Sequence, residues 1–191
     1  MLKLKDSDIR AVLLSNLEER YKDEEDTKVV NEMGVLHGQS RVDVAVINGI
    51  LHGYEIKSES DNLERLPSQM KDYNKVFDRM TIVVQRKYLD EVKKLIPNWW
   101  GIMLVTRYKG ELHLREIRKG RLNKNVDPFS LSHLLWRGEA IEILKEKGLQ
   151  KGYLSKPRHD LYEKICNSVP LVELQTIVNE RLKRRGNWRA H

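Results

Sequence analysis

Three polar residues in segment 41–57 have types and a spacing that could do chemistry. Asp43 is followed after eleven intervening residues by Glu55, and Lys57 comes two residues later. Two carboxylates within reach of each other repel unless a cation sits between them. Oxygen ligands with room for water suit Mg²⁺ or Mn²⁺, and a neighbouring lysine can orient a water or neutralise charge on a transferring phosphate.

The register of this segment decides whether the carboxylates can act together. Segment 41–57 reads RVDVAVINGILHGYEIK and alternates as two strands do, with an Asn-Gly turn signal at 48–49. A two-residue loop would place Asp43 on the face of Tyr54, whereas a three-residue loop or a bulge places it on the face of Glu55. A three-residue loop with its glycine in the left-handed conformation is a common solution. We therefore predict that loop and a shared face for the carboxylates.

The pattern R-x-D-(x)11-E-x-K on a strand hairpin resembles the PD-(D/E)XK nuclease superfamily, whose fold is called restriction-endonuclease-like. Asp43 matches the aspartate of the motif, Glu55 its acidic position and Lys57 its lysine. Val42 stands where the motif usually has a proline. The match covers roughly residues 6–117, and it looks closest to small, poorly characterised members from bacteria and their phages.

A second motif follows the hairpin. Gln69 and Tyr73 form a Q-x-x-x-Y spacing on a predicted helix, which resembles the helix of the RecB-type exonuclease branch. Residues four apart lie above one another on a helix, so both side chains could reach a nucleotide or Lys57. Without the upstream motif, a half-buried tyrosine with a glutamine at its edge would be the better interpretation.

The resemblance implies a metal-dependent nuclease that hydrolyses phosphodiester bonds, with DNA as the favoured substrate. The metal would be Mg²⁺, for which Mn²⁺ can substitute, held by Asp43, Glu55 and the carbonyl of Ile56, while Lys57 orients the attacking water. The alternative is a catalytically silent nucleic-acid-binding or interaction protein of the same fold, in a phage-defence or mobile-element setting. The sequence does not decide whether the protein forms a homodimer. It also leaves open whether the substrate is DNA or RNA and whether the protein cuts as an endonuclease or an exonuclease.

Other residues are candidates because of their positions. Arg41 shares a strand face with Asp43 and could contact a phosphate or pair with Glu32. Glu32 lies in a predicted strand and is either a third acidic ligand or an ordinary exposed residue. Arg65 stands just ahead of the Gln69 helix and is a candidate for substrate contact.

The end of the first helix offers two more acidic residues. By the resemblance, either Glu18 or Glu19 could complete the site. The alternative for each is a solvated helix end.

The elements that must position these residues follow from hydrophobic periodicity. Helices are predicted over 6–21, 67–77, 88–96, 127–147, 158–166 and 171–185, and strands outside the hairpin over 28–36, 79–85, 99–106 and 111–117. This order predicts an α/β fold, in which a mixed sheet of restriction-endonuclease-like type is flanked by helices and followed by an all-helical appendage. We place the nuclease-like core at 1–120 and a basic helical C-terminal region at 127–191.

The amino-acid composition limits which classes of protein this chain can belong to. The net charge of +7 is uneven, with 8 Lys+Arg against 12 Asp+Glu in residues 1–60 and 27 against 16 thereafter, which suits a protein that handles a polyanion. One cysteine excludes an internal disulfide, and the six histidines lack metal-ligand spacing. No apolar stretch approaches the ~20 residues of a membrane span, and no signal peptide is visible, so we expect a cytoplasmic protein. The basic residues of 181–189 are either a phosphate-contacting arm or a solvated end.

Overall fold

The computed structural model describes residues 4–59 and 61–186 and has a mixed six-stranded sheet at its centre. The strands lie side by side in chain order: β1 (Lys28–Val35), β2 (Ser40–Ile47), β3 (Leu51–Lys57), β4 (Arg79–Gln85), β5 (Gly101–Tyr108) and β6 (Glu111–Arg118). The first three strands form an antiparallel meander, β3, β4 and β5 are parallel, and β6 returns antiparallel to β5. The two parallel connections each carry a helix, as such crossovers require.

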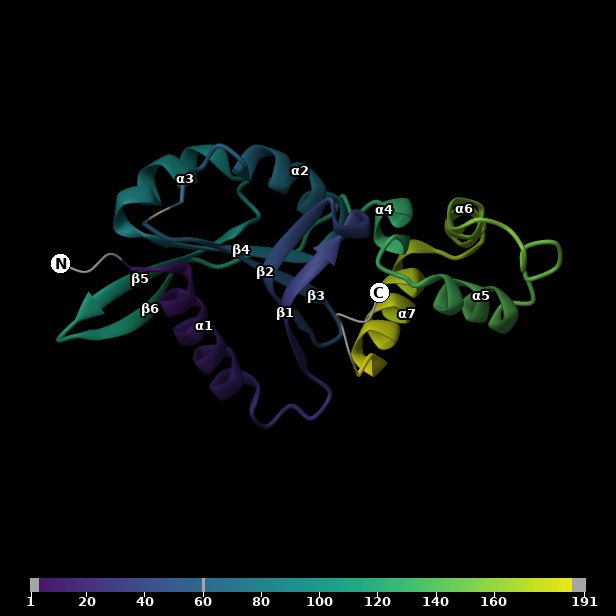
Figure 1. Ribbon diagram of the computed structural model, residues 1–191, viewed down its shortest axis with the longest axis horizontal. Coiled ribbons are helices and arrows are strands. Elements are labelled where there is room, and N and C mark those ends of the chain that lie inside the picture. The colour runs from purple at the N-terminus through teal and green to yellow at the C-terminus, as the bar shows by residue number, and fades with distance from the viewer. Residues whose placement is uncertain (1–3, 60, 187–191) are drawn as a thin grey trace.

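Helices cover both faces of this sheet (Figure 1). One face is covered by α1 (Asp6–Tyr21) and the other by α2 (Leu66–Val76) and α3 (Leu89–Leu95), with single 3₁₀ turns η1 (Leu36–Gly38) and η2 (Arg86–Tyr88) in the connections. The remaining helices are α4 (Pro128–Ser132), α5 (Arg137–Glu146), α6 (Arg158–Ser168) and α7 (Leu171–Arg184). The predicted α/β class, with a mixed sheet flanked by helices and a helical C-terminal part, is confirmed.

Two apolar clusters hold these layers together. Ile9, Leu13 and Leu17 recur every four residues along α1 and are fully buried against one face of the sheet. The other cluster joins the opposite face to α2 and α3 and continues without a break into the four C-terminal helices, where Tyr162 and Leu174 are buried. The C-terminal helices therefore share a core with the sheet.

The hairpin has the predicted register. Val44 pairs with Tyr54 and Ile47 with Leu51, which leaves a loop of residues 48–50. Gly49 occupies the left-handed region, with φ of 89°. Continuing the register places position 43 opposite position 55. Both the three-residue loop and the shared face of the two carboxylates are thus confirmed.

Some predicted boundaries are wrong. The helix predicted over 127–147 is two helices, because the chain turns between α4 and α5 and Glu139 restarts a helix by accepting the Trp136 N–H at 2.7 Å. The strand predicted from 99 begins at Gly101, since the Trp100 N–H closes a turn onto the carbonyl of Pro97. Apolar residues continue through both places, so periodicity alone does not reveal these turns.

The basic stretch that begins at residue 181 is part of the folded structure. Arg181 pairs with Glu146, Lys183 with Asp26, and the buried Arg185 with Glu139. For Arg181, Lys183 and Arg185 the solvated-end interpretation is wrong, because their charges are paired within the fold, whereas contact of this stretch with phosphates stays a prediction. Arg189 lies outside the described residues.

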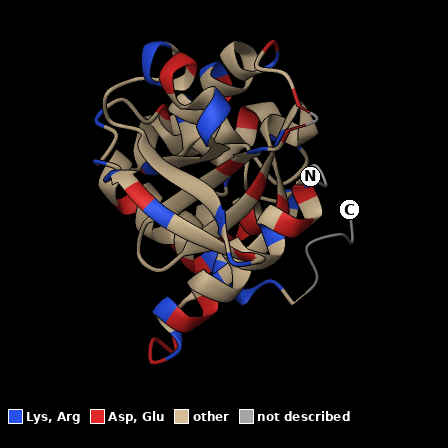
Figure 2. Ribbon diagram, turned by 90° about the vertical axis from the view of Figure 1, so that its left-hand side faces the viewer, with Lys and Arg blue, Asp and Glu red and all other residues tan. Residues whose placement is uncertain are grey.

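Both signs of charge are spread over one side of the fold. Figure 2 shows Lys and Arg positions interspersed with Asp and Glu positions over the side that it presents. The net charge is therefore not concentrated in one block on that side. In the described part of the chain, no helix combines the length and the apolar character needed to cross a membrane.

Candidate active site

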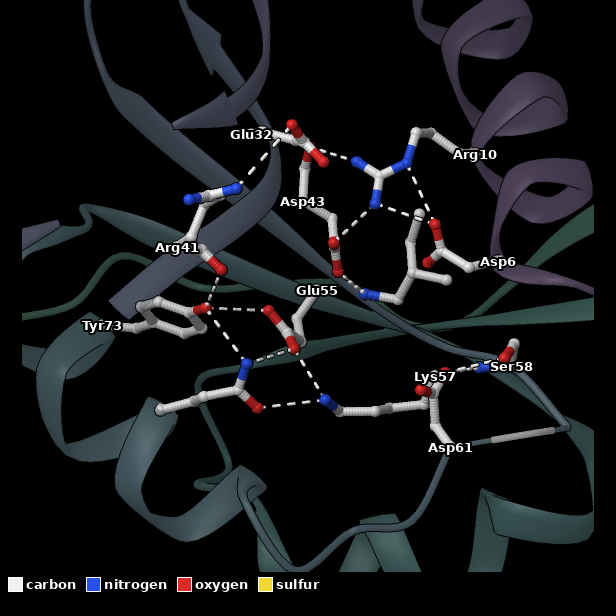
Figure 3. Close-up of polar contacts among 12 residues, drawn as sticks. Asp6, Arg10, Glu32, Arg41, Asp43, Glu55, Lys57, Ser58, Asp61 and Tyr73 are labelled. Atoms are coloured by element: carbon white, nitrogen blue, oxygen red, sulfur yellow. Dashed lines mark hydrogen bonds and ion pairs between the residues drawn. The ribbon is translucent and has the colours of Figure 1, made fainter. Parts of the chain in front are cut away.

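Most of the predicted site residues, all but Glu32 and Tyr73, line a pocket of about 450 Å³ beside the carboxyl end of β3. The pocket is also bordered by the first turns of α1, the approach to β2 and the N-terminal turn of α2 (Figure 3). Its lining includes Asp6, Arg10, Arg41, Asp43, Glu55, Ile56, Lys57, Asp61, Arg65 and Gln69. Segments distant in the sequence therefore supply one polar hollow.

Glu55 is the most enclosed acid of this pocket. Its side chain is 3% exposed and accepts three hydrogen bonds, from Lys57 Nζ and Gln69 Nε2 at 2.7 Å each and from Tyr73 Oη at 2.9 Å. Burial raises the pKa of Glu55 to about 7, and the charge of Asp43 acts in the same direction while Lys57 opposes it. This carboxylate is thus held in place by its donors and costly to ionise.

Lys57, Gln69 and Tyr73 form one hydrogen-bonded group around that acid. Lys57 Nζ lies 3.0 Å from Gln69 Oε1, and Tyr73 Oη lies 2.7 Å from the carbonyl of Arg41. The i, i+4 spacing on α2 puts Gln69 and Tyr73 on the face that covers β3. Tyr73 is fully buried, and burial raises the pKa of its hydroxyl. The structure therefore brings the Q-x-x-x-Y pair to the E-x-K pair.

Asp43 is tied to α1 across the sheet. Its Oδ1 lies 2.7 Å from Arg10 Nη2, and its Oδ2 accepts the Ile56 N–H at 2.7 Å. Arg10 also donates to the carbonyl of Asp43 and pairs with Asp6 at 2.9 Å. Burial raises the pKa of Asp43, whereas the Ile56 N–H and Arg10 act to lower it. A protein cation thus lies beside each of the two predicted carboxylate ligands, Arg10 beside Asp43 and Lys57 beside Glu55.

Sequence reasoning did not identify Arg10 and Asp6 as part of the site. Their i, i+4 spacing near the start of α1 is the one signal that points to them, and it is equally typical of a surface ion pair. The decisive contact joins residues 33 positions apart, so it depends on how α1 packs on the sheet.

Other candidates lie at the margin. Arg41 is exposed and lies 3.9 Å from Glu32, so the pairing interpretation of Arg41 is confirmed. Glu32 has φ of 54° in β1 and lies on the side of Asp43 away from Glu55 (Figure 3). Arg65 lines the pocket from the residue before α2.

The acids at the end of α1 lie away from the pocket. Glu19 is exposed and pairs with Lys22 at 2.7 Å, and Glu18 is exposed about three turns beyond Asp6. The helix instead contributes Asp6 and Arg10 from its first turns.

The ligand atoms available in the pocket can be compared with those that the predicted metal needs. Within residues 4–59 and 61–186, no cluster of three or more His, Cys, Asp and Glu side chains is arranged to hold a metal ion. The predicted set, two carboxylates and the Ile56 carbonyl, is smaller than such a cluster. All of its members are hard oxygen donors of the kind that Mg²⁺ and Mn²⁺ take.

Comparisons with known proteins give one family and one curated relative. The family model described as "Bacteriophage P4 protein cII" matches residues 2–189. "Protein cII" of Enterobacteria phage P4 is 28% identical over 160 residues, which are 84% of this chain and 60% of the relative. The chain therefore spans 60% of the length of that relative. A solved protein of unknown function from Silicibacter pomeroyi aligns with a TM-score of 0.44 at 21% identity, covering 80% of this chain and 97% of that one.

Proposed function

We propose that this chain, which belongs to the bacteriophage P4 protein cII family, is a metal-dependent nuclease that hydrolyses phosphodiester bonds of DNA. The observation that carries the proposal is the convergence of Asp43, Glu55, Lys57 and Gln69 in one pocket at the end of β3. A buried and a half-buried carboxylate beside a buried lysine are an expensive arrangement for stability alone, and such clusters are typical of functional sites.

The donor chemistry fits a divalent ion. Asp43, Glu55 and the carbonyl of Ile56 would hold Mg²⁺. Burial raises the pKa of both carboxyls, although Arg10 beside Asp43 and Lys57 beside Glu55 act to lower it. When bound, the ion would supply Lewis-acid activation of the phosphodiester and of the attacking water. Its affinity should depend on pH because both ligands must be ionised.

The residues of the chain have separate roles in this proposal. Lys57 holds a positive charge where negative charge develops on the phosphate, and it orients the attacking water. Gln69 and Tyr73 fix Glu55 and Lys57 through hydrogen bonds of 2.7 to 3.0 Å. Arg10 and Arg65, at the rim of the same pocket, would contact phosphates of the substrate.

The alternative is a nucleic-acid-binding or interaction protein that keeps this arrangement without cutting. One observation favours it: protein groups already donate to both oxygens of Asp43 and both oxygens of Glu55. A divalent ion would have to share or displace these partners.

A cleavage assay tests the proposal. The full chain is incubated with linear, circular, branched and single-stranded DNA, with Mg²⁺, Mn²⁺ or EDTA. We expect cleavage that requires the metal and is abolished in Lys57→Ala, while Lys145→Ala, an exposed lysine on α5, cuts as the wild type does. Binding of these DNAs without any metal-dependent cleavage would support the alternative instead.

A further inference from the structure

A second and larger pocket lies outside the candidate active site. It has a volume of about 660 Å³ and opens between η1 and the C-terminal helices. Its lining includes His37 and Gly38 from η1, His133 and Trp136 from the α4–α5 connection, Arg137 of α5 and Arg158 of α6. None of these side chains has a role in the chemistry proposed above.

Aromatic rings from three segments stand in a row that starts at this pocket, where His37 and His133 line it, and continues beyond the lining to Phe129 and His159. His37 stacks on His133 with 4.5 Å between ring centroids, His133 contacts Phe129 at 4.8 Å, and Phe129 contacts His159 at 5.2 Å. His37 and His159 at the two ends are exposed, and the members between them are half-buried. The row thus presents ring faces and edges to solvent at both ends.

The row is accompanied by positive charge. Arg137 and Arg158 line the pocket, and within the described residues neither has an acidic side chain at ion-pair distance. The two acids of the lining are already engaged, Glu139 with Arg185 and Glu142 with Arg181. The pocket therefore offers aromatic surface together with Arg158 and with Arg137, whose guanidinium also donates to the carbonyls of Leu154 and Lys156.

The turn η1 connects this pocket to the candidate active site. Gly38 lines both pockets, so they are separated only by the width of that turn. Leu36 and His37 within it have φ of 50° and 57°, a conformation that non-glycine residues adopt at a cost. The surrounding fold thus holds the His37 ring in place at the cost of local backbone strain.

We propose that the pocket between η1 and α6 binds nucleotides of a single-stranded nucleic acid. The bases stack on the row of His37, His133, Phe129 and His159, and the phosphates contact Arg137 and Arg158. Stacking on aromatic rings beside basic groups is how proteins hold single strands without reading sequence. The inference rests on the proposed function in one respect: the same strand would continue past Gly38 into the candidate active site.

Binding is tested separately from cutting. Fluorescence anisotropy of a labelled oligo-dT and of a duplex of equal length is measured with the full chain in EDTA. The variants are His37→Asn, since asparagine tolerates the left-handed backbone, and Arg158→Gln, which removes a cation from the first turn of α6. Lys145→Gln, an exposed lysine on α5 outside the pocket, is the matched control. Thermal melts establish that all variants are folded.

We expect each pocket variant to weaken oligo-dT binding about fivefold or more, and the control to bind as the wild type does. Arg158→Gln should also reduce the salt dependence of binding by about one phosphate contact. Folded pocket variants that bind oligo-dT like the wild type would overturn the inference, and so would an equal loss of affinity for oligo-dT and duplex. If the wild type never cleaves DNA but both variants lose oligo-dT binding, the inference stands and the proposed catalysis fails.

Discussion

Glu55 couples its own ionisation to the stability of the fold. The carboxyl is buried among Lys57, Gln69 and Tyr73, and burial raises its pKa from a normal value near 4.5 to about 7. A carboxyl whose pKa is raised in the folded state stabilises the protein fully below its unfolded pKa, and this contribution is lost as the pH rises through the folded pKa. The relevant window is therefore pH 4.5 to 7.

The wild type should lose stability across that window relative to Glu55→Gln, by an amount on the order of 3 kcal/mol in the absence of divalent ions. The glutamine keeps the shape and removes the titration. Urea unfolding at pH 5, 6, 7 and 8 on both proteins measures the difference. Parallel pH profiles for the two proteins would show that Glu55 does not titrate in this range.

Arg10 places a positive charge beside Asp43, so it should oppose a divalent ion at the same carboxylate. Arg10→Gln is expected to tighten Mn²⁺ binding severalfold because like charges separated by a few ångströms repel. Calorimetric titration of the wild type, Arg10→Gln and Asp43→Asn with Mn²⁺ makes the test. Lys22→Gln, an exposed cation at the far end of the same helix, controls for net charge. Weaker binding in Arg10→Gln would mean that Arg10 holds Asp43 in its metal-binding position.

At the scale of elements, features set by local chemistry were predictable from the sequence. The hairpin loop follows from an Asn-Gly pair and from the need to put Asp43 and Glu55 on one face, and the i, i+4 spacing fixes Gln69 above Tyr73. The contact of Arg10 with Asp43 was not predictable, because it needs the docking of α1 on the sheet. The turn between α4 and α5 was not predictable either, because the apolar pattern continues on both sides of it.

Gly101, the first residue of β5, has close neighbours in β4 and in the backbone at the end of β6. A β-carbon at this position would lie 2.7 Å from Thr81 Oγ1, 2.9 Å from the amide nitrogen of Gly120 and 3.2 Å from the carbonyl of Arg118. Gly101→Ala should therefore destabilise the protein by about 1–3 kcal/mol. Gly138→Ala is the control, because a β-carbon there meets open space in α5. Equal unfolding midpoints for the two variants would contradict this account of the packing.

At the scale of the whole molecule, the C-terminal helices and the sheet should unfold together. They share one apolar cluster, and Asp78, just before β4, accepts hydrogen bonds from both Leu51 N and Gln175 Nε2. We expect one calorimetric transition whose van't Hoff and calorimetric enthalpies agree. Two resolved transitions would mean that the two parts are independently stable.

A single substitution at Arg185 tests how strongly the C-terminal helices stabilise the fold. Its side chain is 6% exposed, pairs with Glu139 and donates to the carbonyl of Leu134. Arg185→Ala leaves a half-buried acid without its partner and should cost about 3 kcal/mol. Arg184→Ala, one residue earlier and exposed, should change stability by less than about 0.5 kcal/mol. Urea unfolding of both variants gives the comparison, and similar losses would mean that charge rather than burial is responsible.

The contacts of Lys28 determine when β1 can complete its folding during synthesis. As the first residue of β1 it donates to the carbonyls of Lys183 and Arg185, partners 155 and 157 positions further along the chain. A ribosome adds roughly 5–20 residues per second, so β1 emerges on the order of ten seconds before these partners exist. Until then the apolar surface that α4 to α7 cover is open to solvent. Chaperones that bind apolar segments would have their opportunity in that interval, and slow codons ahead of α7 would lengthen it.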